Sequence, residues 1–108
     1  YGGNLLAARA ALYVLERLTG TAEPVPYAGG GLIGHVRRIG PVFGERLEAL
    51  RSKHAGVVEA VRGEGVMRGL VLTVDATEVV EGARARGLLV NRTAERVVRM
   101  LPPFTVTE

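Results

Sequence analysis

The sequence predicts a small α+β domain, in which a small antiparallel or mixed sheet of about four short strands has helices packed on one face. Two observations predict this class. Apolar residues recur first with a helical and then with a strand period, in the order helix, helix, two strands, helix, two strands. The chain also has 108 residues, of which 47% are hydrophobic, so it can bury one modest core.

The composition argues against several kinds of site. The chain has no cysteine, and its two histidines, His35 and His54, are too far apart in sequence for a metal-binding motif, so we expect no metal. No apolar run approaches the roughly 18 residues of a membrane span, so we expect no membrane partner. The net charge of +3 is spread along the chain and aromatic residues make up only 5%, so we expect no nucleic-acid partner.

Residues 1–18 are predicted to be a linking or interface helix. Asn4 is a plausible N-cap, and an Ala- and Leu-rich helix follows over residues 5–18. This helix is apolar on several sides, which indicates that protein beyond this chain covers it. Because Tyr1 is not a natural start and no leader pattern follows, we expect the chain to be a piece of a longer protein.

Residues 19–31 are predicted to be a Gly/Pro-rich loop, and residues 32–108 a small C-terminal α+β domain that is truncated at its end. The triple glycine of the loop lacks the Gly-Lys-Ser/Thr ending of a P-loop, so a flexible connector is favoured. Residues 32–54 have helical periodicity, but Gly40-Pro41 interrupts it. We therefore expect a kink there, or two shorter helices.

Two strand pairs and one helix complete the predicted domain. Residues 56–74 are predicted to form a β-hairpin with its turn at residues 63–65. Residues 75–86 are predicted to be a helix with Asp75 as N-cap and Gly87 just after its end. The second pair is predicted from a strand at 88–91, a turn at 92–95 and a strand at 97–100, and residues 105–108 are expected to begin another helix.

Arg99 is the candidate binding residue of the last strand. It interrupts an apolar run, and Pro102 and Pro103 end the strand soon after it. A guanidinium held at the end of a strand can bind both oxygens of a carboxylate through two parallel hydrogen bonds. The same pattern also fits an arginine on the solvated face of an edge strand, and the pattern alone does not decide between the two.

Four stretches in order resemble one family. They are Tyr1-Gly2-Gly3-Asn4 before an alanine-rich helix, Arg62-Gly63-x-Gly65-x-Met67-x-Gly69-Leu70, Gly87-Leu88-Leu89-Val90-Asn91, and Val98-Arg99-x-Leu101-Pro102-Pro103-x-Thr105. Together they resemble the C-terminal small domain of the class III, pyridoxal-phosphate-dependent aminotransferases, nearest to those that act on acetylornithine or on carrier-protein-bound lysine. The resemblance covers almost the whole chain.

The resemblance implies a cytoplasmic homodimer that binds pyridoxal 5'-phosphate mainly through a large domain outside this chain. The implied reaction moves the terminal amino group of N-acetylornithine, or a similar ω-amino acid, to the 2-oxo acid 2-oxoglutarate, in arginine or lysine biosynthesis. The family lysine that forms the Schiff base lies before this segment. The only lysine here, Lys53, falls in a polar helical turn and does not match it, so the fragment alone is expected to be inactive and to contain no catalytic residue.

Residue by residue, the resemblance implies that Arg99 binds the substrate α-carboxylate, and this favours the binding role left open above. It places Gly2, Gly3 and Asn4 near the cofactor phosphate at the subunit interface. Leu5 stands where the family often has proline, and residues 19–31 are more glycine-rich than expected. The alternative is a free-standing, non-catalytic interaction or dimerisation module that reuses the fold, and the size of the native protein would separate the two.

Overall fold

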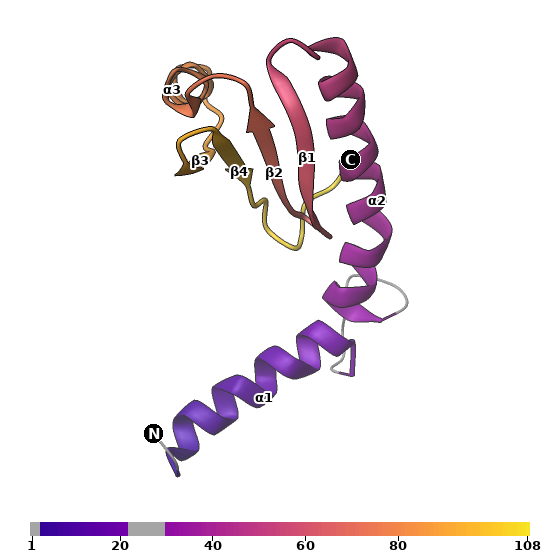
Figure 1. Ribbon diagram of the computed structural model, residues 1–108. Helices are drawn as coiled ribbons and strands as arrows, with labels where there is room; N and C mark the ends of the chain where they lie inside the picture. Colours follow the sequence, from indigo (N-terminus) through magenta and orange to yellow (C-terminus); the bar gives the residue numbers. More distant parts are fainter. Residues whose placement is uncertain (1–2, 22–29) are drawn as a thin grey trace.

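A computed structural model describes residues 3–21 and 30–108, which form three helices and an open four-stranded antiparallel sheet (Figure 1). The predicted α+β class is confirmed. The elements are α1 (Leu5–Thr19), α2 (Gly31–Lys53), β1 (Val58–Glu64), β2 (Met67–Leu72), α3 (Ala76–Ala85), β3 (Asn91–Ala94) and β4 (Val97–Met100).

The sheet has the strand order β1-β2-β4-β3, and every neighbouring pair is antiparallel. β1 and β2 form one hairpin, and β3 and β4 form a second. α3 connects the two hairpins, and β4 returns to pair with β2, which places it between β2 and β3 (Figure 1). β4 is therefore hydrogen-bonded on both sides, so it is an inner strand of the sheet.

The core lies on one face of this sheet. Leu70 of β2 pairs with Val98 of β4, and both side chains are buried against Leu47 of α2 and Ala76 of α3. Both helices thus cover the same face, as the sequence predicts. Burying an aliphatic side chain of this kind contributes about 1.5–3 kcal/mol, so the shared cluster is what holds α2 and α3 on the sheet.

α1 extends away from the sheet (Figure 1). The Asn4 side chain accepts a hydrogen bond from the Ala7 N–H at 3.1 Å, which confirms the predicted N-cap, and Gly20 ends the helix in the left-handed conformation. No residue of α1 is buried, and Leu5 and Leu6 are 85% and 81% exposed. The apolar surface that the sequence predicts for this helix is therefore uncovered among the described residues.

α2 is a single helix that continues through Pro41, so the predicted division into two helices is wrong. A proline in a helix removes one backbone donor, which weakens the ladder locally. Packing on both sides of Pro41 offsets this loss: Gly40 is buried before it and Leu47 after it. Gly40 also approaches the backbone of Gly65 so closely that a Cβ at position 40 would lie 2.9 Å from the Gly65 Cα.

The β1–β2 hairpin is confirmed, but its turn lies further along than predicted. Glu64 pairs with Met67, so the two turn residues are Gly65 and Val66, and Gly63 lies inside β1. Val66 is only 2% exposed. Its burial shifts the turn, because an apolar side chain at the tip gains from packing inward.

Arg68 fastens this hairpin to α2. Its guanidinium donates hydrogen bonds to the carbonyl oxygens of Gly63 at 2.7 Å, Gly65 at 3.0 Å and Gly40 at 3.3 Å. The first two carbonyls belong to the end of the hairpin and the third to α2. One side chain therefore satisfies three backbone acceptors and joins two elements.

The Arg68→Ala substitution should lower the free energy of unfolding by about 2 kcal/mol, because three hydrogen bonds from a charged donor, two of them part-buried, are lost together. Chemical denaturation of the full-length protein would measure this loss. Arg51→Ala is the matched control, since Arg51 pairs with Glu48 at 2.6 Å on the exposed side of α2 and should contribute below about 0.5 kcal/mol. Equal effects of the two substitutions would contradict the role given to Arg68.

The predicted caps of α3 are confirmed. Asp75 accepts a hydrogen bond from the Thr77 N–H at 2.7 Å, and Gly87 and Leu88 donate back to the last turn in a Schellman pattern. Hydrogen bonds from the Thr77 side chain and backbone lower the pKa of Asp75 below its usual value. Burial opposes this effect, and Arg92, 3.0 Å away, lowers the pKa further.

The third strand does not lie where the sequence predicts it. The prediction gives a strand at 88–91 and a turn at 92–95, whereas β3 is Asn91–Ala94. β4 decides this register, because Asn91 pairs with Arg99 and Ala94 with Val97 around a bulge. Residues 88–90 have strand-like composition but no strand to pair with, and Leu89 is 83% exposed. Residues 105–108 form no helix, contrary to the prediction.

Candidate substrate-binding site

Arg99 lies on the face of the sheet opposite to the helices. Side chains alternate along β4, and its neighbour Val98 points into the core. Residues that pair across strands share a face, so Gly69, Arg99 and Asn91, which are in register, all lie on this second face. β4 is an inner strand, so the edge position of the second alternative is wrong, although the face that carries Arg99 is not covered by α2 or α3.

The Arg99 guanidinium has an unused donor. Its Nε is buried and forms no hydrogen bond, and no carboxylate of the described residues pairs with it. A buried N–H without a partner costs free energy, so such a group in a native protein requires an explanation. A carboxylate bound by the guanidinium fork would supply the missing acceptor.

One row of residues crosses the sheet on this face. Arg62 of β1 pairs with Gly69 of β2, Gly69 pairs with Arg99 of β4, and Arg99 pairs with Asn91 of β3. Arg62 and Arg99 therefore flank Gly69, and the amide residue Asn91 lies on the other side of Arg99. The sequence alone does not bring these residues together, because the register between strands is not visible in the order of residues along the chain.

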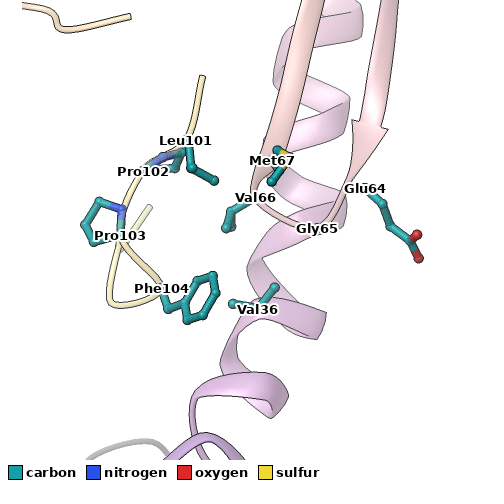
Figure 2. Close-up of a pocket in the computed structure, with 9 residues that line it drawn as sticks. All are labelled: Val36, Glu64, Gly65, Val66, Met67, Leu101, Pro102, Pro103 and Phe104. Atoms are coloured by element: carbon teal, nitrogen blue, oxygen red, sulfur yellow. The ribbon is translucent and has the colours of Figure 1, made fainter. Parts of the chain in front are cut away.

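An apolar recess lies where the β1–β2 turn meets the segment after β4 (Figure 2). Its volume is about 570 Å³. Phe104 and Val36 point toward one another across it, whereas Glu64, the one charged residue of its lining, points away (Figure 2). Val66, Met67, Leu101, Pro102 and Pro103 complete most of the wall. Arg99 is not part of this lining, and apart from Glu64 the lining residues carry no ionisable side chain.

The structure does not bring the other predicted site residues to Arg99. Gly2 lies outside the described residues. Gly3 and Asn4 precede α1, at the end of the molecule away from the sheet (Figure 1). The Asn4 side-chain oxygen caps α1, and Gly3 has a φ of 88° with no atom within 4 Å of an added Cβ. What the geometry shows for this segment is a helix cap.

The remaining ionisable candidates are structural or exposed. The His35 Nε2 lies 2.7 Å from the carbonyl oxygen of Val106 and so links α2 to the C-terminal segment. Lys53 is exposed in the last turn of α2 and lines no enclosed site, so it does not fit a Schiff-base lysine. Within residues 3–21 and 30–108, no cluster of three or more metal-ligating side chains occurs, and no helix has the length and hydropathy to cross a membrane.

Comparison with known proteins identifies the family. The class-III aminotransferase family matches residues 1–108, the whole chain. The chain belongs to the class-III aminotransferases. Among similar sequences, an acetylornithine aminotransferase of Caldanaerobacter subterraneus is 38% identical over 109 residues, which cover 100% of this chain and 25% of the relative. A mitochondrial acetylornithine aminotransferase of Neurospora crassa is 39% identical and is covered to 22%.

Solved structures of aminotransferases share the fold of this chain. A lysine aminotransferase of M. tuberculosis superimposes with a TM-score of 0.68 at 28% identity, over 70% of this chain and 18% of that one. An acetylornithine aminotransferase of Elizabethkingia anophelis, at a TM-score of 0.64 and 22% identity over 70% of this chain and 20% of that one, shows the shared fold alone. The chain thus spans about a quarter of the length of the curated relatives it matches.

Proposed function

We propose that this chain is the C-terminal part of an aminotransferase that moves the terminal amino group of N-acetylornithine, or of a similar ω-amino acid, to 2-oxoglutarate. The observation that carries the proposal is the match of the family to the whole chain, with acetylornithine aminotransferases among the similar sequences. The reaction would belong to arginine or lysine biosynthesis, in a cytoplasmic enzyme.

Within this enzyme, Arg99 binds the α-carboxylate of the substrate. The buried, unpartnered Nε and the absence of an ion pair to any described carboxylate support this role. A strand that is hydrogen-bonded on both sides keeps the guanidinium in place, so the substrate is oriented with its terminal amine held away from Arg99.

Pyridoxal phosphate supplies the electron sink for amino-group transfer when it is bound. The described residues do not fit the main part of its site, because the one lysine of the chain is exposed at the end of α2. We therefore propose that the Schiff-base lysine and most of the cofactor contacts belong to a large domain outside this chain. Gly2, Gly3 and Asn4 would approach the cofactor phosphate in a homodimer. The apolar and exposed surface of α1 is consistent with contacts to that domain.

The full-length protein should convert N-acetylornithine and 2-oxoglutarate to glutamate and the aldehyde that the donor becomes on losing its terminal amine, because it would combine the lysine with Arg99. A coupled glutamate assay on the native enzyme measures this, with residues 1–108 alone as the inactive control. An immunoblot with an antibody against this chain gives the native size. A native protein of about the size of this chain, with no transaminase activity, would instead support a free-standing interaction module.

A further inference from the structure

Two glycines meet where α1 ends and α2 begins. Gly20 ends α1 with a φ of 77°, and Gly31, the first residue of α2, is buried and has a φ of 61°. A Cβ at Gly20 would lie 2.6 Å from the backbone nitrogen of Gly31. A Cβ at Gly31 would lie 2.7 Å from the carbonyl oxygen of Arg17 and would overlap the backbone nitrogen of Gly20. Both positions therefore require glycine, for the backbone conformation and for the closeness of the two backbones.

This contact is the corner at which α1 joins the rest of the described chain. α1 has no buried residue, and only residues 16–18 in its last turn are half-buried. Residues 22–29 lie outside the described residues, but the two ends of the connection adjoin at Gly20 and Gly31. From this corner α1 extends away from the sheet (Figure 1). The angle between α1 and α2 is thus set at one point of contact between backbones.

Backbone hydrogen bonds hold both sides of the corner. The N–H groups of Gly20 and Thr21 donate to the carbonyl oxygen of Glu16, at 3.0 and 3.1 Å. On the other side, the Gly34 N–H donates to the carbonyl oxygen of Gly30 at 2.9 Å, which begins the hydrogen bonds of α2. The atoms that meet at the corner are therefore not the ends of flexible side chains. An added methyl group fits there only if the two helix ends separate.

A small separation at the corner displaces the far end of α1 by more. A methyl group 2.6 Å from a backbone nitrogen has to move out to about 3.5 Å, so the helix ends separate by about 1 Å. α1 has 15 residues and is therefore roughly 22 Å long. Because α1 is held mainly at this end, the separation turns the helix, and its far end moves by several ångströms.

We infer that Gly20 and Gly31 are positioning residues, whose contact sets the angle at which the rest of the enzyme holds the sheet. The inference rests on the proposed function, because it assumes that a large domain covers the apolar surface of α1. When that surface is fixed on the large domain, a change of angle at the corner moves the sheet relative to the active site. A misplacement of about 1 Å in an active site can lower a rate by about 100-fold, so a contact remote from the chemistry controls it.

Alanine substitutions in the full-length enzyme test the contact. Gly20→Ala and Gly31→Ala should each lower kcat/KM for N-acetylornithine by at least about tenfold, measured well below the melting temperature. Gly87→Ala is the matched control, because Gly87 also follows a helix and has a left-handed φ of 81°, but no atom lies within 4 Å of an added Cβ. It should lower the melting temperature, as Gly20→Ala does, and leave kcat/KM within about twofold.

A longer connection separates the contact from the loop that spans it. Inserting Gly-Ser between Val25 and Pro26 keeps the Gly20–Gly31 contact, so it should leave kcat/KM within about twofold. If the insertion impairs the enzyme as much as Gly31→Ala does, the length of the connection sets the angle and the inference fails. It also fails if Gly20→Ala and Gly87→Ala change kcat/KM equally, since the backbone strain alone would then explain the loss.

A distance measurement tests the angle without relying on activity. The chain has no cysteine, so spin labels can be placed at Arg9→Cys in α1 and Glu81→Cys in α3, both exposed, after replacement of any cysteine elsewhere in the full-length protein. With labelled subunits diluted in unlabelled ones, the distance between the labels should change by several ångströms in Gly20→Ala and stay constant in the insertion variant. An unchanged distance in Gly20→Ala overturns the inference. A changed distance in an enzyme that does not use N-acetylornithine supports the corner and overturns only the proposed function.

Discussion

Replacing Arg99 by alanine in the full-length enzyme should lower kcat/KM for N-acetylornithine by about 100-fold, which corresponds to about 2.7 kcal/mol of transition-state binding. The reason is that the proposed charge-assisted, two-point contact to the carboxylate, from a strand that is hydrogen-bonded on both sides, would be lost. Steady-state kinetics with N-acetylornithine as the varied donor measure the effect.

N-acetyl-1,4-diaminobutane, which is N-acetylornithine without its carboxylate, provides the control for the Arg99→Ala substitution. Its kcat/KM should change by less than about threefold, because it never uses the guanidinium. The absorbance of the bound cofactor should also be unchanged. Arg99→Lys should recover only part of the loss, since an ammonium is a point charge that cannot form two parallel hydrogen bonds. Normal turnover of N-acetylornithine by Arg99→Ala would show that Arg99 is not the carboxylate site.

Replacing Gly63 by valine should destabilise the protein by about 3 kcal/mol or more, because two penalties coincide. The φ of Gly63 is 104°, a conformation that a β-branched residue rarely adopts. In addition, a Cβ at this position would overlap the carbonyl oxygen of Met67 on the paired strand. Thermal or chemical unfolding of the full-length variant gives the size of the effect.

Substitutions at two other glycines, Gly65 and Gly56, provide comparisons for the loss of stability expected of Gly63→Val. Gly65 has a φ of 56°, where asparagine is tolerated, so Gly65→Asn should cost much less than Gly63→Val. Gly56→Val should leave stability within about 0.5 kcal/mol, since position 56 is exposed, does not have a left-handed φ and has no atom within 4 Å of an added Cβ. A melting temperature of Gly63→Val close to the wild-type value would contradict the backbone conformation described for β1.

Features that depend on a few neighbouring residues were predictable from the sequence. The N-caps at Asn4 and Asp75 and the stop at Gly87 follow from short-range hydrogen bonds, and all three are observed. The β4 strand was also predicted with its observed bounds, because the two prolines after it allow little else. The resemblance to the class-III aminotransferases likewise rests on local motifs, and the family match confirms it.

Features that depend on which strands meet were decided only by the tertiary structure. Residues 88–90 have the composition of a strand, but β4 pairs with residues 91–94 instead, because pairing register is a property of two segments and not of one. α2 continues through Pro41 because buried contacts on both sides of the proline offset the lost hydrogen bond. The proline penalty of about 3 kcal/mol is comparable to the burial of one or two aliphatic side chains, so packing can outweigh it.

The sequence by itself determined the fold class, most of the elements and Arg99 as the candidate binding residue. Only the tertiary structure placed Arg99 on an inner strand, on the open face, in one row with Arg62, Gly69 and Asn91. The physical reason is that a strand directs successive side chains to opposite faces, and burial then selects which set enters the core. The burial of Val98 against α2 and α3 is therefore what directs its neighbour Arg99 toward the other side.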